Sequence, residues 1–541
     1  MSKFRNENLK NRLAGMQPKE NLVEAVTMPK PDTKNRQGHA AYSLDKWLRL
    51  LTMLNTLKLE NQFYRSENET MRELKSLVDE CAKEDTYLVA QCIVYSRCVG
   101  EGMRSINHLA ASYLAPHCSG KDWAKRFYSL WNKKTKSGGT VFRPDDMSEI
   151  LACFSSMNKT KVINSMKKGF ASAIEGMDSY SLLKYKTSLI DVINLVHPRP
   201  EKSSAMVEVN GKRISTIDAI MKGLSVSADT WEVAQSDAGQ EVAKAVKDGK
   251  IDAKEAEEIL KEAKAENWSS LLNEGKLGIL AALRNIRNIL KTEVKSQVVE
   301  SLCDLLSNGE MIRKGKIMPY QLDLANEVVI SEFNSPDARK ISQALLRGYE
   351  MATPNLAEVL NGRNLVIVDM SGSMSTQVVD PNRKTRYRST AMDKACLIGA
   401  TIAKASNADI IRFGSGAEYV KWNPNSDVFS IASSMKRDMG MTSLSTAWKL
   451  AESSGKKYDR VFILSDNECN RGSSYSSYMS YVKSCGGPYV YSVDLAAYGT
   501  TQVVGDKVRF YYGFGYSMFD DITKSEFNPN YHLDKVKQIV I

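Results

Sequence analysis

Apolar residues recur at spacings of three and four along most of the first 360 residues, which places them on one face of each of a series of α-helices. The first such stripe lies between residues 44 and 54. The others span residues 70–82, 86–98, 103–115, 147–155, 161–174, 179–195, 278–291, 296–307 and 336–348. Short polar or glycine-containing turns join neighbouring stripes, which is typical of an α-solenoid of HEAT or armadillo type. We therefore expect residues 1–360 to form a domain of helical repeats.

Residues 201–267 interrupt this helical pattern. Residues 208–213 predict a small hairpin, and residues 238–266 form a helical stretch rich in Ala, Lys and Glu. We interpret the segment as a peripheral, solvated insertion without chemistry of its own.

Near residue 361 the pattern changes from helical stripes to short apolar runs that alternate with helical stretches. The runs span residues 365–368, 409–412, 461–464 and 489–493, and the helical stretches include 391–405 and 444–453. This alternation predicts a doubly wound α/β sheet within residues 361–541. Ligands of such sheets bind beyond the carboxyl ends of the strands, at the point where the strand order reverses.

Carboxyl and hydroxyl side chains follow two of these predicted strands. Asp369, Ser371 and Ser373 come directly after the first strand, Asp466 directly follows the third, and Thr442 lies in a glycine-led loop between them. Oxygen ligands of this kind suit a hard cation such as Mg²⁺ or Mn²⁺. In order and strand context, the set resembles the metal-ion-dependent adhesion site of von Willebrand factor A domains. The alternative is that these side chains only cap helices and turns.

A serine hydrolase is another interpretation of the same residues. Ser371 lacks the G-x-S-x-G elbow, since Asp369 and Ser373 occupy the two glycine positions. No histidine lies between residues 198 and 531 to serve as its base. We therefore do not expect an enzyme.

Composition bears on the compartment of the protein. No stretch reaches the roughly 20 apolar residues of a membrane span, and no apolar signal segment follows residues 1–5. The nine cysteines contain no C-x-x-C pair, which favours reduced, mostly buried thiols over a disulfide framework or a zinc site. We expect a soluble, cytoplasmic monomer that makes no contact with a membrane.

Basic charge is concentrated in the first third of the chain. Residues 1–200 contain 31 Lys and Arg against 21 Asp and Glu, a net charge of +10, whereas the whole chain carries +11. An excess of this size predicts the place where a polyanion would dock, although a solvated basic face would look the same.

A helical-repeat region followed by an adhesion-type A domain resembles the Ro family, the TROVE-domain RNA-binding proteins. Residues 182–186 and 194–200 are similar to the family's K-Y-K segment and to the helix that ends in H-x-K-P. Residues 282–286 are similar to its L-R-N-L helix, and residues 365–374 to its V-D-x-S-x-S-M strand and loop.

This resemblance implies a ring of helical repeats closed by the A domain. Its central hole would hold the single-stranded 3′ ends of misfolded or partly degraded noncoding RNAs, and its outer surface would bind small Y RNAs. On the matching positions, Lys184, Lys186 and His197 fall at the Y-RNA surface. Arg284 is the candidate for a contact inside the hole. Resemblance to bacterial relatives also makes an exoribonuclease such as polynucleotide phosphorylase an expected partner.

The basic candidates have structural interpretations as well. Lys167 and Lys168, one helix before the K-Y-K segment, extend the predicted patch, but lysines also occupy solvated helix faces. Arg97, Arg104 and Arg287 lie on or beside apolar helices, where structural ion pairs explain arginines as often as ligands do. Among functions of another class, a scaffold whose A domain captures an acidic residue of a partner through Mg²⁺ stays open.

Overall fold

The computed structural model describes residues 29–541 except 58, 60, 101, 132, 134–140, 158–161, 225, 227–241, 243–251, 293–295, 316, 318, 353–359, 376–389 and 514–521. None of the described helices is long and apolar enough to cross a membrane. All nine cysteines are free thiols and six of them are buried, as predicted.

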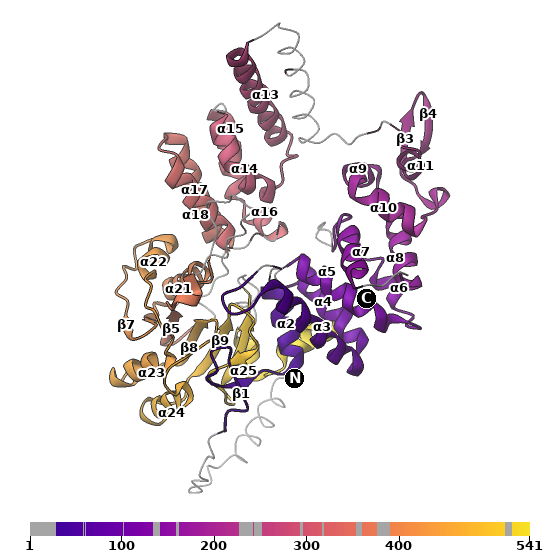
Figure 1. Cartoon of the computed structure of the whole chain (residues 1–541). Helices are drawn as coiled ribbons and strands as arrows, with labels where there is room; N and C mark the ends of the chain where they lie inside the picture. Colours follow the sequence, from indigo (N-terminus) through magenta and orange to yellow (C-terminus); the bar gives the residue numbers. More distant parts are fainter. Residues whose placement is uncertain are drawn as a thin grey trace, which may run out of the picture.

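Residues 46–221 form the first helical block, drawn to the right of the sheet in Figure 1. Its helices are α2 (Lys46–Thr56), α3 (Glu67–Glu84), α4 (Thr86–Cys98), α5 (Ser105–Leu114), α6 (Ala124–Phe127), α7 (Asp146–Ser156), α8 (Asn164–Glu175), α9 (Ser179–Lys184), α10 (Lys186–Val196) and α11 (Thr216–Met221), with 3-10 turns at Ala115–Cys118 and Pro200–Lys202. Most of the predicted stripes are thus helices.

The predicted helix at 179–195 is an exception, because the chain forms two helices there. Asp178 begins α9 by accepting a hydrogen bond from the Ser181 N–H. At Tyr185 the backbone leaves the helical region (φ −104°, ψ 13°), and α10 begins one residue later.

The predicted insertion begins with the expected hairpin. Strands β3 (Met206–Val209) and β4 (Lys212–Ser215) pair antiparallel. The two turn residues Asn210 and Gly211 both have positive φ, as a tight two-residue hairpin requires. The segment is not solvated throughout, because α11 packs on α9 and α10 and buries Ile217 in the core of the first block.

Residues 253–352 form the second helical block, which lies above the sheet in Figure 1. Its helices are α13 (Ala253–Asn273), α14 (Ile279–Lys291), α15 (Ser296–Leu306), α16 (Gly309–Lys314), α17 (Pro319–Glu332) and α18 (Pro336–Ala352). Of the helical stretch predicted at 238–266, residues 238–241 and 243–251 lie outside the described residues, and 253–266 belong to α13.

Residues 364–541 form the α/β unit. Its six-stranded sheet has the order β11 (Val508–Tyr512), β9 (Tyr489–Asp494), β8 (Arg460–Ser465), β5 (Asn364–Asp369), β6 (Asp409–Phe413) and β7 (Ala417–Tyr419). All neighbours are parallel except β6 and β7. The strand order therefore reverses between β5 and β8. The predicted strands are all present, and β7 and β11 are additions.

Helices cover both faces of this sheet. They are α20 (Gly372–Ser375), α21 (Ala391–Ser406), α22 (Val428–Met435), α23 (Leu444–Ser453), α24 (Ser474–Cys485), α25 (Ile522–Phe527) and α26 (Tyr531–Lys537). Alternate β5 residues enter different cores: Val366 packs in the core that contains α21 and the second helical block, and Leu365 in the core that contains α23 and α24. The doubly wound arrangement predicted from the sequence is therefore observed.

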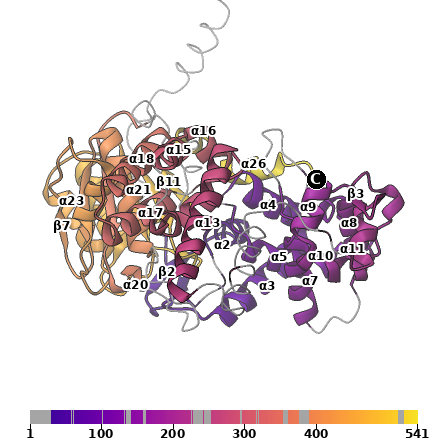
Figure 2. The same cartoon turned by 90° about the horizontal axis from the view of Figure 1, so that it is seen from above.

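The first helical block is attached to the α/β unit by both ends of the described chain. Near the N-terminus, β1 (Thr33–Lys34) pairs with β2 (Ala40–Ser43), and β2 pairs with β10 (Thr500–Thr501). At the other end, the Gln91 side chain donates to the carbonyl oxygen of Ile539 over 2.7 Å. Figure 2 shows α26 reaching over α4. The sequence analysis predicted neither attachment.

A buried ion cluster joins α4, α5 and α7 within the first block. The fully buried Asp146 carboxylate lies 3.1 Å from Nη2 of Arg97 and 2.5 Å from Nη2 of Arg104. Burial works to raise the pKa of Asp146, but the hydrogen bond to His108 and the charges of His108 and the two arginines outweigh it and hold that pKa well below its usual range. Arg97 and Arg104 therefore have structural roles.

We expect Asp146→Asn to lower the free energy of unfolding by about 3 kcal/mol or more, because it leaves two guanidinium groups without their buried counter-charge. Asp145→Asn is the control: Asp145 also pairs with Arg104, at 3.1 Å, but is partly exposed, and its loss should cost less than about 1 kcal/mol. Urea unfolding followed by circular dichroism measures both. Equal losses would show that the buried cluster has no special role.

Candidate functional site

Three loops meet at the carboxyl ends of the central strands and bring the predicted metal ligands together. The first (residues 369–373) follows β5, the second (439–442) precedes α23, and the third (466–472) follows β8. The N–H of Gly372 donates to the carbonyl oxygen of Gly440 over 3.0 Å, and that of Asn470 to the carbonyl oxygen of Thr442 over 3.0 Å. We call these segments the strand-end loops.

Four of the five predicted ligands are buried within these loops, and Ser373 is half-buried. Asp369 is 0% exposed and Asp466 2% exposed. The Asp369 carboxylate accepts hydrogen bonds from the Ser371 N–H over 2.9 Å and from the Ser465 hydroxyl over 2.5 Å. The hydroxyl oxygens of Ser371 and Ser373 lie 3.2 Å apart, and Thr442 is also buried. The five residues named from the sequence thus share one site.

Neither Asp369 nor Asp466 forms an ion pair with a Lys, Arg or His of the described residues. Burial raises the pKa of Asp369 to about 7, and the charge of Asp466 adds to this effect. Burial also raises the pKa of Asp466, against a hydrogen bond from Ser373. Two buried carboxyl groups in this position favour either a shared proton or a bound cation.

The donor set fits a hard divalent cation. It consists of two carboxylates and three hydroxyls, and Mg²⁺ and Mn²⁺ prefer oxygen ligands and keep several water molecules. Within the described parts of the chain, no three His, Cys, Asp or Glu side chains gather into a metal cluster. Hydroxyl and water oxygens would therefore complete the coordination here.

Two further residues at this site were not identified from the sequence. Glu468 is 0% exposed, and its N–H donates to the Asp466 carboxylate over 3.1 Å. Tyr64, from the segment before α3, has its hydroxyl beside Ser373, and burial and the charge of Asp466 raise its pKa. No sequence signal could have placed Tyr64 here, because it lies about 300 residues before the loops.

The predicted outer basic residues lie around α9 and α10. Lys184 is exposed at the end of α9, Lys186 begins α10, and the exposed His197 follows the end of α10. Lys186 Nζ donates to the carbonyl oxygen of Val226 over 2.5 Å, so part of its hydrogen-bonding capacity is used within the chain. A helix of this length separates Lys186 from His197 by roughly 16 Å, a span that suits an extended polyanion.

Aromatic and basic neighbours enlarge this surface. Lys184 Nζ lies 5.5 Å from the ring centre of Tyr180, which is 52% exposed. The guanidinium of Arg143 lies 5.8 Å from the ring of Tyr185. Tyr180 and Arg143 were not identified from the sequence. A Tyr one helical turn before a Lys is a sequence signal that could have identified Tyr180.

Lys167 and Lys168 lie on α8, Lys167 half-buried and Lys168 exposed. Helix α8 crosses α6 closely at Gly169, where a Cβ atom would lie 2.5 Å from Cβ of Tyr128. Exposed Lys125 and Arg126 on α6 therefore adjoin the same surface.

Arg284 lies on the second helical block, away from these residues. It is exposed on α14, on the same face as Asn288 and Lys291. Arg287 forms an ion pair with Glu332 on α17. The structure thus places the two predicted RNA contact regions on different helical blocks.

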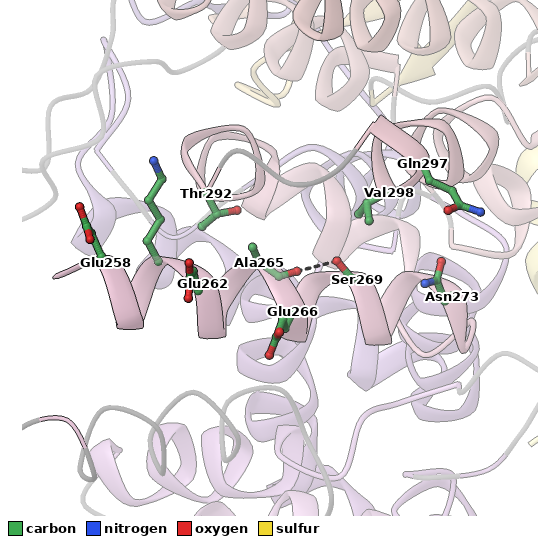
Figure 3. Close-up of a pocket in the computed structure, with 10 residues that line it drawn as sticks. Glu258, Glu262, Ala265, Glu266, Ser269, Asn273, Thr292, Gln297 and Val298 are labelled. Carbon is green, nitrogen blue, oxygen red and sulfur yellow. Dashed lines mark hydrogen bonds between the residues drawn. The ribbon is translucent and has the colours of Figure 1, made fainter. Parts of the chain in front are cut away.

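A groove of about 790 Å³ lies beside α14, between α13 and the start of α15. Figure 3 shows its lining, with Glu258, Glu262 and Glu266 along α13 and with Gln297 and Val298 on the opposite wall. Three carboxylates and one lysine, Lys261, line this wall, and a net negative wall disfavours a nucleic-acid backbone.

A family model decides which family the chain belongs to. The model of the TROVE domain matches residues 82–392, from the end of α3 to the start of α21 and more than half of the chain. The chain belongs to the TROVE-domain family, that of the Ro proteins. The resemblance seen in the sequence is confirmed. TROVE-domain proteins bind RNA, so an RNA partner is expected.

Comparison with solved structures agrees with this TROVE assignment. The crystal structure of the Ro (Rsr) protein of Deinococcus radiodurans is similar to this chain with a TM-score of 0.56 and 14% identity, over 89% of this chain and 100% of that one. At this identity it supports the Ro fold alone. Proximal thread matrix protein 1 of the mussel byssus matches 36% of this chain and 52% of its own, with 13% identity and a TM-score of 0.21, too low to bear on the fold. No curated protein sequence matches the chain.

Proposed function

We propose that this TROVE-domain protein binds noncoding RNA at two places: single-stranded 3′ ends of misfolded or partly degraded RNA in a central hole, and a Y-like small RNA on the outer surface. The observation that carries the proposal is the family match over most of both helical blocks. Such a protein would serve cytoplasmic RNA quality control, with an exoribonuclease such as polynucleotide phosphorylase as a partner.

The proposed ring consists of HEAT-like helical repeats, residues 1–360, closed by a von Willebrand factor A domain, residues 361–541. Two contacts support it. The second helical block shares a hydrophobic core with α21 and α22, and the first block shares another with Tyr512, Val536 and Ile541. A chain whose two helical blocks both pack on the α/β unit can enclose a hole between them.

Inside the hole, we assign Arg284 as a phosphate contact. Its exposed position on α14 beside Asn288 and Lys291 supports this role. Phosphate contacts position RNA without reading its sequence, so the free end would decide which RNAs bind.

On the outer surface, we assign Lys167, Lys168, Lys184, Lys186 and His197 to the Y-like RNA. The exposed Tyr180 ring beside Lys184 would add a stacking surface for an unpaired base.

At the strand-end loops, we propose that Asp369, Ser371, Ser373, Thr442 and Asp466 hold one Mg²⁺ or Mn²⁺. The all-oxygen donor set supports this, as does the fact that neither carboxylate forms an ion pair within the described residues. The ion would supply positive charge that offsets the buried carboxylates.

Asp369→Ala should abolish the rise in melting temperature that Mg²⁺ or Mn²⁺ gives the wild type, because one of the two carboxylate ligands is lost, and should leave RNA binding intact. Asp427→Ala, which removes a carboxylate that caps α22, is the control and should keep the metal-dependent rise. Differential scanning fluorimetry with and without EDTA measures this. An equal rise in wild type and Asp369→Ala would argue against the assigned ligands.

A duplex with a 3′ single-stranded tail should bind more tightly than the same duplex made blunt or a circular RNA of equal composition, because only a free end can thread a closed ring. Arg284→Ala should weaken binding of the tailed RNA and reduce the salt dependence by about one phosphate contact. Arg287→Ala, whose arginine is ion-paired with Glu332, is the control. Gel shifts over a salt series that give equal affinities for the three RNAs would remove the threading model. Equal affinities would favour nonspecific RNA binding to a basic surface, or a protein-interaction scaffold without an RNA ligand.

Replacing Lys184, Lys186 and His197 by Ala should weaken binding of a structured small RNA by at least tenfold, given the usual contribution of several phosphate contacts, and spare the tailed duplex. Lys75→Ala with Lys83→Ala, on the exposed side of α3, removes the same number of lysines and should have little effect. Gel-shift titrations with both RNAs measure the difference. Equal loss for the two RNAs contradicts separate sites.

A further inference from the structure

The strand-end loops are covered by residues from the N-terminal end of the described chain. The turn between β1 and β2 lies on the third loop: Asn35 Nδ2 donates to the carbonyl oxygen of Cys469 over 2.6 Å, and His39 Nε2 lies 2.8 Å from that of Gly472. The Asn35 side chain also accepts hydrogen bonds from the Gln37 and His39 N–H groups, and so holds the turn itself. We call residues 35–39 the capping turn.

The capping turn also holds Glu468, the buried carboxylate two residues after Asp466. Oε2 of Glu468 accepts from the N–H groups of Arg36 over 2.8 Å and Gln37 over 3.3 Å. Oε1 is buried and has no hydrogen-bond partner among the residues that the structure describes. Hydrogen bonds to a carboxylate are stronger than neutral ones, so the capping turn and Glu468 depend on each other.

A second segment, residues 62–65, contacts the loops from the same side. The Tyr64 hydroxyl adjoins Ser373 of the first loop and Gln37 of the capping turn, and both side chains work to lower its pKa. The Arg65 side chain is fully buried and donates to the carbonyl oxygens of Ala496 and Ala497 over 3.2 and 3.1 Å. We call residues 35–39 and 62–65 together the N-terminal cover. Two of the proposed metal ligands, Ser373 and Asp466, therefore lie beside it.

Glu73 of α3 connects this cover to the first helical block. It pairs with both Arg36 and Arg65, and the two guanidinium groups lie 5.4 and 5.3 Å from the ring centre of Tyr498. A movement of the third loop would therefore displace Arg36 and change its ion pair with Glu73 of α3.

We propose that the surface around the metal site is an interaction surface for this chain's own residues 35–39 and 62–65, and that cation binding and docking of these residues strengthen each other. This inference rests on the metal site proposed above. A cation held by Asp369 and Asp466 fixes the first and third loops and offsets the repulsion between Asp466 and Glu468. The third loop then holds in place the hydrogen-bond acceptors of the capping turn, which are the Glu468 carboxylate and the carbonyl oxygens of Cys469 and Gly472.

The coupling has a consequence for ligands of the metal site. The capping turn occupies the third loop, so an acidic residue of another protein that approaches the cation from this side would compete with it. The cation would therefore act within the chain, at the seam between the first helical block and the α/β unit. Because coupling between two binding events is reciprocal, a change that weakens docking of the capping turn must also lower the affinity for the cation.

Hydrogen exchange of the full-length wild-type protein tests one direction of the coupling. Saturating Mn²⁺, compared with EDTA, should slow amide exchange in residues 35–39 and 62–65. The hairpin β3–β4, which lies in the first block away from the seam, should be unchanged.

Asn35→Ala tests the reverse direction. It removes the bond to Cys469 without altering a proposed ligand, and should weaken Mn²⁺ binding roughly tenfold by isothermal calorimetry. Asn364→Ala is the matched control: Asn364 is a buried asparagine that donates to the Leu360 carbonyl oxygen over 2.8 Å, at the opposite end of β5 from Asp369. It should bind Mn²⁺ as the wild type does.

The outcomes separate this inference from the proposed metal site. If Mn²⁺ binds the wild type, but exchange at the cover is unchanged and Asn35→Ala binds as tightly as Asn364→Ala, the coupling is overturned and the metal site stands. If the wild type binds no Mn²⁺ at all, both are overturned. Slower exchange at the cover together with selective loss of affinity in Asn35→Ala establishes the coupling.

Discussion

The central strands of the α/β unit must be buried on both faces, and the remaining architecture depends on this requirement. Every residue of β5 is buried, as in other parallel strands. One face is covered by α21 and the second helical block, and the other by α23 and α24. The first helical block packs instead on β11 and on the C-terminal residues. Both helical blocks therefore depend on the α/β unit for part of their apolar burial.

The same sheet creates an electrostatic problem at its carboxyl edge. Asp369 and Asp466 lie at the ends of neighbouring strands, and Glu468 is buried two residues after Asp466, so Asp466 has a buried carboxyl group on either side of it in the fold or in the chain. Backbone N–H groups and hydroxyls satisfy some of their oxygens, two of those N–H groups coming from the capping turn. Burial of charge without a counter-ion costs free energy. The proposed cation and the N–H groups of the capping turn would both lower this cost.

Basic residues of the helical blocks differ in their contacts and in their exposure. Arg97, Arg104 and Arg287 pair with carboxylates, whereas Lys184, His197 and Arg284 are exposed. The exposed set lies on two separate blocks, which suits a protein that holds two RNA segments at once. An acidic groove beside α14 limits where a phosphate backbone can run on the second block.

The sequence alone determined the helical stripes, the doubly wound sheet and the five candidate ligands, because each depends on spacing within one element or on the ends of adjacent parallel strands. It also carried the family resemblance, which the TROVE-domain match confirms. The break at Tyr185 was not predictable from a continuous apolar stripe. Only the tertiary structure could place Tyr64 and Asn35 at the strand-end loops or show that Arg97 pairs with Asp146, because such contacts depend on how distant segments pack together, and no local spacing encodes them.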